Sequence, residues 1–486
     1  MQLHDLLNGL EVLETAGDLN GAVTTVTHDS RLVTPGAVFA CIRGEPSDGH
    51  DHAPAAVDAG ASALLVERLL PLPVPQARVA DVRAVLGPVA ARCYGEPSDS
   101  LTCIGVTGTN GKTTATHLLE AIGNAAGLRT GLIGTLGTRI AGEDVPGMLT
   151  TPEASDLQAL LARMREAEVS FVALEVSSHA LAQRRVDGTH FAVACFTNLS
   201  PDHLDFHGSL EAYFEAKASL FDTGRSAAAA VNIDDARGPV LARRAAANGL
   251  KVKTFGMDVP AADVSAEVVE AGSATRFILR ADGRRAAIHS PLVGRFNVSN
   301  ALGAAASALA AGIPFPAVAE GLQAPVRVPG RLERVDAGQP FSVIVDYAHS
   351  PDALTRVLGV ARALVDRGRV LVVFGAGGDR DREKRPQMGR AVGDAADVAV
   401  LTSDNPRSED PAAIAAAVVP GLEAAGAKYT IELDRRVAIR QVLDEAGPGD
   451  VVVIAGKGHE TGQTTAGVTR PFDDRVVVRE ELEARR

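Results

Sequence analysis

Short apolar runs that alternate with longer segments of helical composition constrain the fold of this chain more than any other feature. After residue 100 these runs read LTCIGV, RTGLIGT, SFVALEVSS and FAVACFTNL. Strands of a parallel sheet are continuous apolar runs, because helices cover both faces of the sheet. The alternation therefore predicts an α/β fold with a mostly parallel sheet in this part of the chain.

The alternation stops at the proline-flanked segment 325–329 and then resumes. The second set of apolar runs reads FSVIVDY, RVLVVFGA, VAVLTSD and DVVVIAG. Such a set, separated from the first by a break, is typical of a second α/β domain of the Rossmann-like kind. Between the two sets, the Ala-rich stretch 300–311 has helical composition.

The length of the chain sets the number of domains. A chain of 486 residues exceeds what one hydrophobic core usually supports. The first hundred residues contain strand-like runs at 37–42 and 63–66, and they end in the turn-rich segment 95–100, which we interpret as a linker. We therefore predict three domains, which span residues 1–98, 99–328 and 329–486.

The charge balance excludes some classes of partner. With 48 basic and 60 acidic residues the net charge is −12, which argues against a general binder of nucleic acid or of anionic membranes. The N-terminal segment lacks the basic start and apolar core of a secretory signal, and no apolar stretch is long enough to span a membrane. The cysteines have no C-x-x-C spacing and fit reduced core thiols; they are Cys41, Cys93, Cys103 and Cys195.

The sequence TGTNGKTT, residues 107–114, is the strongest local signal. It follows the strand-like run LTCIGV and opens a helical segment, which is the context of a phosphate-binding loop. Glycines let backbone N–H groups approach phosphate oxygens, Lys112 supplies positive charge, and the hydroxyl of Thr113 suits magnesium. We expect Lys112 on an exposed loop. Val106 stands where the strict pattern has glycine, and an ordinary strand-to-helix turn is the alternative.

Two further side chains follow predicted strands of the same sheet. Glu175 ends the run SFVALE, and His203 lies in a Pro-Asp-His turn after the next run. Ligands of α/β proteins bind at the carboxyl ends of parallel strands, so a carboxylate there is a natural ligand for Mg²⁺. Imidazole is an uncommon ligand for a hard cation, and a surface histidine is the alternative for His203.

The form GTNGKTT resembles the phosphate loop of the Mur ligases and of their folylpolyglutamate synthase relatives. Further resemblance follows in the order of that family. The matching segments are EVSSHALAQRR (175–185), TNLSPDHLDFHG (197–208), YFEAKASLF (213–221), GRFNVSN (294–300), GRLE (330–333) and DYAHSPDAL (346–354).

Three C-terminal motifs resemble the branch of the family that adds diaminopimelate. They are GGDRDREKRPQMG (377–389), DNPRSEDP (404–411) and GKGHE (456–460). The N-terminal segment HDSRLVTPGAVFACIRG (28–44) resembles the uridine-nucleotide domain of the same branch. The resemblance implies an N-terminal uridine-nucleotide domain, a central ATP-binding domain and a C-terminal domain that brings the amino acid.

The resemblance also implies a reaction. ATP phosphorylates the D-glutamate γ-carboxylate of UDP-N-acetylmuramoyl-L-alanyl-D-glutamate, and the amine of meso-diaminopimelate then displaces phosphate from the acyl phosphate, in peptidoglycan precursor synthesis. Two Mg²⁺ ions are implied. The lysine of the YxEAK segment, Lys217, is implied to be carbamylated (N6-carboxylysine), so that it can hold a metal. Because only a neutral amine reacts with CO₂, we expect Lys217 to be desolvated or near cations.

The implied site residues fall into five groups. The catalytic group contains Lys112, Glu175, His203 and Lys217, and the metal ligands are Thr113, Glu175, His203 and carbamylated Lys217. The implied ATP contacts are Gly108, Thr109, Asn110, Gly111, Lys112, Thr113, Thr114, Asn297, Arg331 and Asp346. The implied contacts of the nucleotide dipeptide are Ser30, Thr150, Thr151, Ser177, Gln183 and Arg185.

The implied contacts of diaminopimelate follow predicted strands of the C-terminal domain. They are Arg380, Asp404, Asn405, Pro406, Arg407, Gly456 and Glu460. Arginine offers a planar fork for carboxylates, and diaminopimelate carries two, so Arg380 and Arg407 make a reasonable clamp. Exposed arginines in solvated loops are the alternative.

Three other functions remain open at this point. A lysine-adding enzyme of the family is disfavoured by the arginine of DNPR, and a folylpolyglutamate synthase is disfavoured by the N-terminal domain. A P-loop switch without ligase activity is a rival from another class. We expect a cytoplasmic monomer that acts on small molecules, with no nucleic-acid partner and no membrane span.

Overall fold

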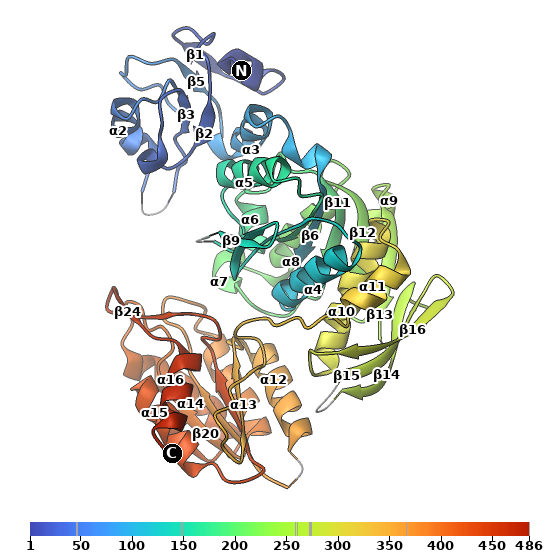
Figure 1. Cartoon of the computed structure of the whole chain (residues 1–486). Helices are drawn as coiled ribbons and strands as arrows, with labels where there is room; N and C mark the ends of the chain where they lie inside the picture. The colour runs from blue at the N-terminus through green and yellow to red at the C-terminus, as the bar shows by residue number, and fades with distance from the viewer. Residues whose placement is uncertain are drawn as a thin grey trace.

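Three sheets follow one another along the chain, and each has its own hydrophobic core (Figure 1). The computed structural model describes residues 1–44, 47–145, 147, 149–257, 259, 261–271, 275–365 and 367–485. The N-terminal unit lies at one end of the molecule, the central unit in the middle and the C-terminal unit at the other end. The predicted α/β class with three domains is therefore confirmed.

The N-terminal unit is built on a five-stranded sheet in the order β1-β5-β4-β3-β2. Its neighbouring strands are parallel except for β1 and β5. The strands are β1 (Glu14–Ala16), β2 (Thr25–Thr27), β3 (Ala37–Ala40), β4 (Ala63–Val66) and β5 (Gln76–Arg78). The helices are α1 (Leu3–Leu7), α2 (Ala53–Asp58) and α3 (Val82–Cys93).

The segment that follows α3 differs from the expected linker. Residues Pro97–Ser100 form a 3₁₀ helix in which Pro97 and Ser98 are buried. The backbone N–H of His190 donates to the Ser98 hydroxyl at 3.1 Å. A turn-rich composition does not reveal such tertiary contacts, and this segment packs against the central unit instead of crossing solvent.

The central sheet has the order β16-β15-β14-β13-β12-β11-β6-β10-β7-β8-β9, with parallel pairing from β7 through to β14. Its first strands are β6 (Thr102–Thr107), β7 (Thr130–Gly134), β8 (Gly137–Ile140), β9 (Glu143–Val145), β10 (Phe171–Glu175) and β11 (Phe191–Phe196). They are followed by β12 (Ser226–Asn232), β13 (Lys251–Gly256), β14 (Val264–Ala271), β15 (Thr275–Ala281) and β16 (Arg284–Ser290). The four apolar runs predicted here are β6, β7, β10 and β11.

Helices cover both faces of the central sheet. One face packs against α4 (Lys112–Ala125), α10 (Arg295–Ala310) and α11 (Phe315–Gly321), and the Ala-rich stretch lies within α10. The core on the other face includes side chains of α5 (Ala154–Glu166), α8 (Leu210–Ala218) and α9 (Gly238–Ala247). Two short helices, α6 (Ser178–Ala182) and α7 (Leu204–His207), follow β10 and β11.

Antiparallel strands at both edges of the central sheet were not expected. They are β8 and β9 at one edge and β15 and β16 at the other. Along β15, buried residues alternate with partly or fully exposed ones, as on a sheet with one solvated face. Such strands lack the continuous apolar run by which the buried parallel strands are recognised.

The C-terminal sheet has the order β17-β18-β22-β19-β20-β21, and only β17 is antiparallel to its neighbour. The strands are β17 (Glu333–Arg334), β18 (Ser342–Asp346), β19 (Val370–Phe374), β20 (Val398–Leu401), β21 (Tyr429–Ile431) and β22 (Val451–Ala455). A hairpin of β23 (Gly462–Thr465) and β24 (Val468–Pro471) follows. The helices are α12 (Pro351–Leu364), α13 (Lys384–Ala395), α14 (Pro411–Ala424), α15 (Arg435–Glu445) and α16 (Asp474–Glu483).

Several sequence expectations can be compared with this fold. The runs predicted in the C-terminal domain are β18, β19, β20 and β22. All four cysteines are free, and Cys93 alone among them is not fully buried. No described helix is long and apolar enough to cross a membrane. The sheets change between residues 78 and 102 and between 290 and 333, and the boundaries at 98 and 328 stay predictions.

A buried ion pair in the C-terminal domain links α15 to α16 and contacts the chain at the ends of β20 and β22. Arg435 of α15 and Asp474 of α16 have no exposed side-chain surface, and their closest charged atoms are 2.7 Å apart. The guanidinium also donates to the carbonyls of Ser403 at 3.3 Å and Ala455 at 2.9 Å. These carbonyls lie just before the DNPR and GKGHE segments, so the pair holds the beginnings of both loops.

Replacing one member of this pair should destabilise the C-terminal domain. Arg435→Met leaves the Asp474 carboxylate buried without a counter-charge, so the free energy of unfolding should fall by about 3–5 kcal/mol. The double variant Arg435→Met with Asp474→Leu removes both charges and should lose less. Urea unfolding followed by circular dichroism measures both changes. A double variant less stable than the single one would contradict this account.

Candidate active site

The phosphate loop lies between β6 and α4, and its glycines are required by close neighbours. A Cβ on Gly108 would lie 1.9 Å from the Thr197 hydroxyl, and a Cβ on Gly111 would lie 2.2 Å from the Asn300 amide oxygen. Both glycines also have positive φ angles, 149° and 91°. The loop therefore packs against the residue after β11 and against α10. This packing places the backbone N–H groups of the loop at the start of α4.

Lys112 is the first residue of α4 and is half-buried, which corrects the expectation of an exposed loop lysine. Its ammonium donates to the carbonyls of Gly108 and Thr109, each at 2.9 Å. Burial lowers the pKa of Lys112, and the carboxylate of Glu175 opposes this shift. The lysine is thus bound by carbonyls of the loop that precedes it, a contact that the sequence motif alone does not reveal.

Glu175 ends β10 and is fully buried. One carboxylate oxygen accepts hydrogen bonds from the hydroxyls of Thr113 at 3.1 Å and Thr135 at 3.0 Å, and the other accepts from the Thr135 N–H at 2.9 Å. Hydroxyl and carboxylate oxygens in contact are the donor set that Mg²⁺ prefers. These residues therefore fit a hard cation beside the phosphate loop.

Lys217 is carried by α8 and is only 1% exposed. Its ammonium nitrogen lies 4.2 Å from the centre of the Tyr213 ring, and no carboxylate of the described residues forms an ion pair with it. Burial lowers the pKa of Lys217 far below its ordinary value, and the charge of Lys112 lowers it further. The expectation that this lysine is desolvated and near a cation is confirmed.

His203 has a left-handed backbone, with φ of 55°, and precedes α7. Its ring contacts His179 with a centroid distance of 4.7 Å, edge to face. Burial lowers the pKa of His203 to about 3, against the opposing charge of Asp202, so the imidazole is neutral. The described residues contain no cluster of three or more His, Cys, Asp or Glu fit to hold a metal. A metal beside Glu175 and His203 would need further oxygen donors.

One cavity of about 490 Å³ brings most of the predicted residues together. Of the predicted ATP, dipeptide and catalytic residues, Gly108, Ser30 and Lys217 do not line it. The predicted residues that do line it are Thr109, Asn110, Gly111, Lys112, Thr113, Thr114, Thr150, Thr151, Glu175, Ser177, Gln183, Arg185, His203, Asn297, Arg331, Asp346 and Arg380. Ser30 belongs to a 3₁₀ turn of the N-terminal unit.

The predicted dipeptide residues surround the end of β10. The Thr151 hydroxyl donates to the carbonyl of Glu175 at 2.8 Å and accepts from the N–H of Ser177 at 3.1 Å. Arg185 is held by an ion pair with Glu153, 3.0 Å between the charged atoms. The buried amide oxygen of Gln183 has no hydrogen-bond partner among the described residues, so it can accept a hydrogen bond from a ligand.

Residues of the C-terminal domain complete the cavity. Arg331 stacks on the Tyr347 ring at 4.4 Å, and its buried Nε has no hydrogen-bond partner. Both carboxylate oxygens of Asp346 accept hydrogen bonds from backbone N–H groups, from that of Leu332 at 2.7 Å and from that of Ala348 at 2.8 Å. The side chain of Asp346 thus holds the backbone at Leu332 and Ala348 in place.

Three polar contacts join the central and C-terminal domains beside the cavity. Asp352 of α12 accepts from the amide of Asn110 at 2.9 Å and from the hydroxyl of Ser200 at 3.3 Å. Lys384 of α13 lies 3.4 Å from the Asp202 carboxylate. The phosphate loop therefore touches the second domain directly.

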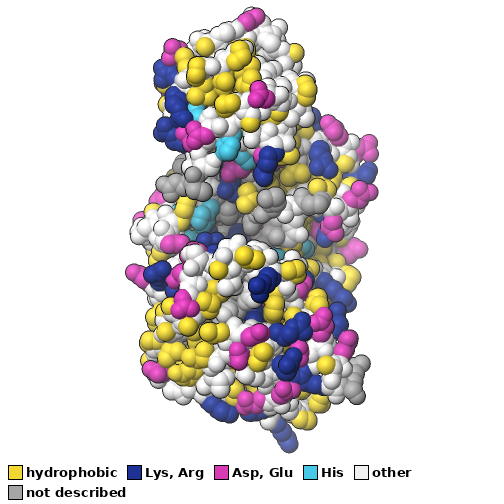
Figure 2. Space-filling model, turned by 90° about the vertical axis from the view of Figure 1, so that its left-hand side faces the viewer, with side chains coloured by type: hydrophobic (Ala, Val, Ile, Leu, Met, Phe, Trp, Pro, Cys, Tyr) yellow, Lys and Arg dark blue, Asp and Glu magenta, His cyan; other side chains and the backbone are white. Residues whose placement is uncertain are grey.

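Figure 2 shows a recess between the C-terminal domain below and the central domain above, with exposed histidines near it. Basic and acidic side chains are interspersed over the face shown.

The predicted amino-acid residues follow β19, β20 and β22. Arg407 has φ of 55°, and one of its guanidinium nitrogens donates to the Gly378 carbonyl at 2.6 Å. No carboxylate of the described residues forms an ion pair with Arg407 or Arg380, and the nearby Glu409 pairs with Arg382 and Arg385 instead. A Cβ on Gly456 would lie 2.4 Å from the Asp404 carboxylate, so glycine is required there.

Several neighbours of the site were not predicted. His179, Asp202, Lys384 and Lys457 all lie within sequence motifs that were recognised, but no role was assigned to them. Their contacts depend on side-chain packing between segments that are far apart in the sequence.

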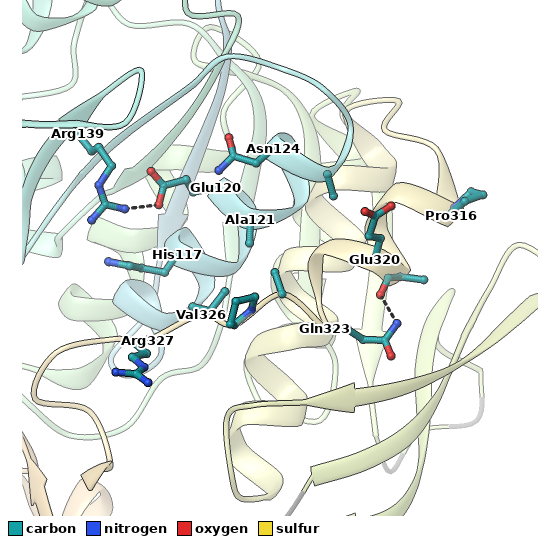
Figure 3. Close-up of a pocket in the computed structure, with 14 residues that line it drawn as sticks. His117, Glu120, Ala121, Asn124, Arg139, Pro316, Glu320, Gln323, Val326 and Arg327 are labelled. Atoms are coloured by element: carbon teal, nitrogen blue, oxygen red, sulfur yellow. Dashed lines mark hydrogen bonds and ion pairs between the residues drawn. The ribbon is translucent and has the colours of Figure 1, made fainter. Parts of the chain in front are cut away.

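A second, larger cavity of about 900 Å³ lies elsewhere on α4 and contains none of the predicted residues (Figure 3). Its lining combines His117, Glu120 and Asn124 of α4 with Arg139 and with the connection to the C-terminal domain. Glu120 and Arg139 already form an ion pair at 2.7 Å. Most of the predicted site residues line the smaller cavity, so we identify the smaller cavity as the candidate active site.

Comparison with known proteins agrees with this geometry. The model of the Mur ligase middle domain matches residues 106–308, that of the glutamate ligase domain of Mur ligases matches 330–458, and that of the catalytic domain of the Mur ligase family matches 22–92.

Individual relatives match along almost the whole chain. The UDP-N-acetylmuramoyl-L-alanyl-D-glutamate--2,6-diaminopimelate ligase of Streptomyces coelicolor is 47% identical over 96% of this chain and 94% of its own length. The protein of the same name from Geobacillus thermodenitrificans is 45% identical over 100% of both chains. A solved structure of such a ligase superposes with a TM-score of 0.70 at 35% identity and covers 100% of this chain and 99% of its own. By its sequence, its fold and the geometry of its cavity, the chain belongs to the Mur ligase family.

Proposed function

We propose that the chain is the ATP-dependent ligase that joins meso-diaminopimelate to the D-glutamate γ-carboxylate of UDP-N-acetylmuramoyl-L-alanyl-D-glutamate. The observation that carries this proposal is the single cavity in which the phosphate loop, the segment around Thr151 and the C-terminal residues Arg331 and Arg380 meet. A ligase must hold a phosphoryl donor, a carboxylate and an amine within reach of one another, and this arrangement supplies that proximity.

The proposed reaction has two steps. The γ-carboxylate attacks the γ-phosphorus of ATP, which forms an acyl phosphate and releases ADP. The neutral amine of the amino acid then attacks the acyl carbon, loses a proton and expels phosphate. Phosphoryl transfer needs positioning and neutralisation of charge. In this proposal Lys112 faces the transferring phosphoryl group, and no covalent protein nucleophile is required.

The proposed Mg²⁺ ions would neutralise phosphate charge when bound. Thr113 and Glu175 would hold one of them, since their oxygens already touch. His203 and Lys217 would hold the second, provided that Lys217 carries a carbamate. A buried lysine with a strongly lowered pKa and no carboxylate partner is the amine that can react with CO₂ at neutral pH.

Arg407 and Arg380 are proposed to bind the carboxylates of the amino acid. Their loops approach each other, because a Cβ on Gly377 would lie 3.1 Å from a guanidinium nitrogen of Arg407 and 3.7 Å from the Cγ of Arg380. An arginine without an ion-pair partner is available for a carboxylate of the ligand. We further propose that the chain acts as a monomer in the cytoplasm.

Product formation with different amino acids tests the proposed function. ADP release should require the nucleotide dipeptide together with meso-diaminopimelate, and L-lysine should support little turnover. Turnover that needs no amino acid would indicate a nucleotide switch. A preference for L-lysine would overturn the proposed substrate.

Replacing Lys112 should abolish ligation. We expect Lys112→Ala to reduce kcat on the order of 100-fold or more, because its charge faces the phosphoryl group. Steady-state ADP release measures the loss, and thermal unfolding checks the fold. The control is Lys428→Ala, which removes an exposed lysine that pairs with Glu445 and should keep full activity. Retention of more than about a tenth of kcat in Lys112→Ala contradicts the proposed role.

The side chain of Lys217 should carry a carbamate at neutral pH. After incubation with isotopically labelled bicarbonate, the wild type should show one protein-bound carbamate resonance that Lys217→Arg lacks. Since a guanidinium cannot become this anion, Lys217→Arg should also be nearly inactive. A fully active Lys217→Arg variant would remove the modification from the mechanism.

Arg407 should set the preference for diaminopimelate. Arg407→Ala should cost about 2–5 kcal/mol in kcat/KM for diaminopimelate, as expected when one partner of a desolvated charge pair is truncated. The KM values for ATP and the nucleotide dipeptide should stay nearly unchanged, and Arg407→Lys should recover only part of the loss, because it lacks the fork. Arg390→Ala, an exposed arginine of α13, is the matched control. An unchanged kcat/KM in Arg407→Ala would show that another group makes the selection.

A further inference from the structure

Lys457 is a buried lysine in the GKGHE segment. The proposed reaction assigns no role to it. Its side chain has no exposed surface. The ammonium lies 3.2 Å from the Asn405 amide oxygen and 3.0 Å from Glu460 Oε2. The Asn405 amide nitrogen also donates to Glu460 Oε2 at 2.7 Å. The three side chains therefore form a closed set of hydrogen bonds between the loops after β20 and β22.

The orientation of Asn405 in this set is fixed by a fourth partner. Its amide oxygen accepts from the backbone N–H of Thr464 at 3.0 Å as well as from Lys457. Because the oxygen faces two donors, the amide nitrogen must face Glu460. Asn405 and Lys457 thus both direct hydrogen bonds to the same carboxylate oxygen.

Glu460 keeps its second oxygen free. No donor among the described residues is hydrogen-bonded to Oε1, and the side chain is 31% exposed. Burial alone would raise the pKa of Glu460, but the charge and hydrogen bond of Lys457 and the bond from Asn405 lower it. Glu460 is therefore an anion with one oxygen bound inside the protein and one oxygen available.

The charge of Lys457 also acts on a second carboxylate, that of Asp404. Asp404 is buried close by, and burial raises its pKa, while Lys457 and Arg435 lower it and the charge of Glu460 raises it. Without the ammonium of Lys457, the two carboxylates would repel each other and Glu460 would turn towards solvent.

We propose that Lys457 is a positioning residue for the amino-acid substrate, whose ammonium fixes Glu460 so that Oε1 accepts an ammonium group of the substrate. This inference rests on the proposed function, because it assigns a role within the same amino-acid site. Lys457 itself does not touch the substrate. It acts through Glu460, so its loss should affect the amino acid and spare the other two substrates.

Lys457→Met tests this role, since methionine keeps most of the length of the side chain without its charge. We expect the KM for meso-diaminopimelate to rise about tenfold or more, because one charged hydrogen bond is lost. The KM values for ATP and the nucleotide dipeptide should stay within about twofold, and Lys457→Arg should lie between wild type and Lys457→Met. A similar rise in all three KM values, as from general loss of structure, would overturn the inference.

A double-mutant cycle shows whether Lys457 acts through Glu460. Once Glu460→Gln is present, adding Lys457→Met should raise the KM for the amino acid by less than about twofold. In this double variant neither position 457 nor position 460 carries a charge without a partner. The double variant should therefore fold and can be assayed even if Lys457→Met alone does not fold. If the wild type prefers another amino acid, the proposed function fails, and the same cycle is run with that amino acid. Additive effects in the cycle, or an unchanged KM in Lys457→Met, would overturn the positioning role.

Discussion

The carboxyl ends of parallel strands all point to one edge of their sheet, and the candidate site depends on this constraint. The phosphate loop follows β6, Glu175 ends β10 and His203 follows β11. In the C-terminal domain Asp346 ends β18, and the loops after β19, β20 and β22 carry Arg380, the DNPR segment and the GKGHE segment. The two sheet edges meet where Asp352 accepts a hydrogen bond from Asn110 of the phosphate loop. One cavity therefore receives groups from two domains.

Lysines that are shielded from solvent are the second common theme of this site. Lys112 is held by loop carbonyls, and Lys457 is held by a carboxylate and an amide. Lys217 has neither kind of partner among the described residues, and burial lowers the pKa of its amine far below the ordinary value. The same side chain thus serves three purposes, because burial and partners determine whether it stays an ammonium or becomes a reactive amine.

The sequence predicted four buried parallel strands in each of the two large domains, because continuous apolar runs are local signals, but it did not reveal the parallel strands β12, β13, β14 and β21. The antiparallel edge strands were missed, since they lack the continuous apolar run by which the buried parallel strands are recognised. The burial of Lys112 and the pairing of Lys457 with Glu460 could not be predicted, because they arise from packing between loops. Likewise, Ser98 is buried in a segment whose composition indicates a linker.

In the proposed mechanism the γ-carboxylate becomes an acyl phosphate before the amine attacks. Transfer of a heavy-oxygen label tests this most directly. The nucleotide dipeptide is labelled in both γ-carboxylate oxygens and turned over with ATP and meso-diaminopimelate, and the released phosphate is analysed by mass spectrometry. Each released phosphate should carry one labelled oxygen, because the bond between that oxygen and the acyl carbon is the one that breaks. Unlabelled phosphate would show that water attacks ATP and would contradict the proposed mechanism.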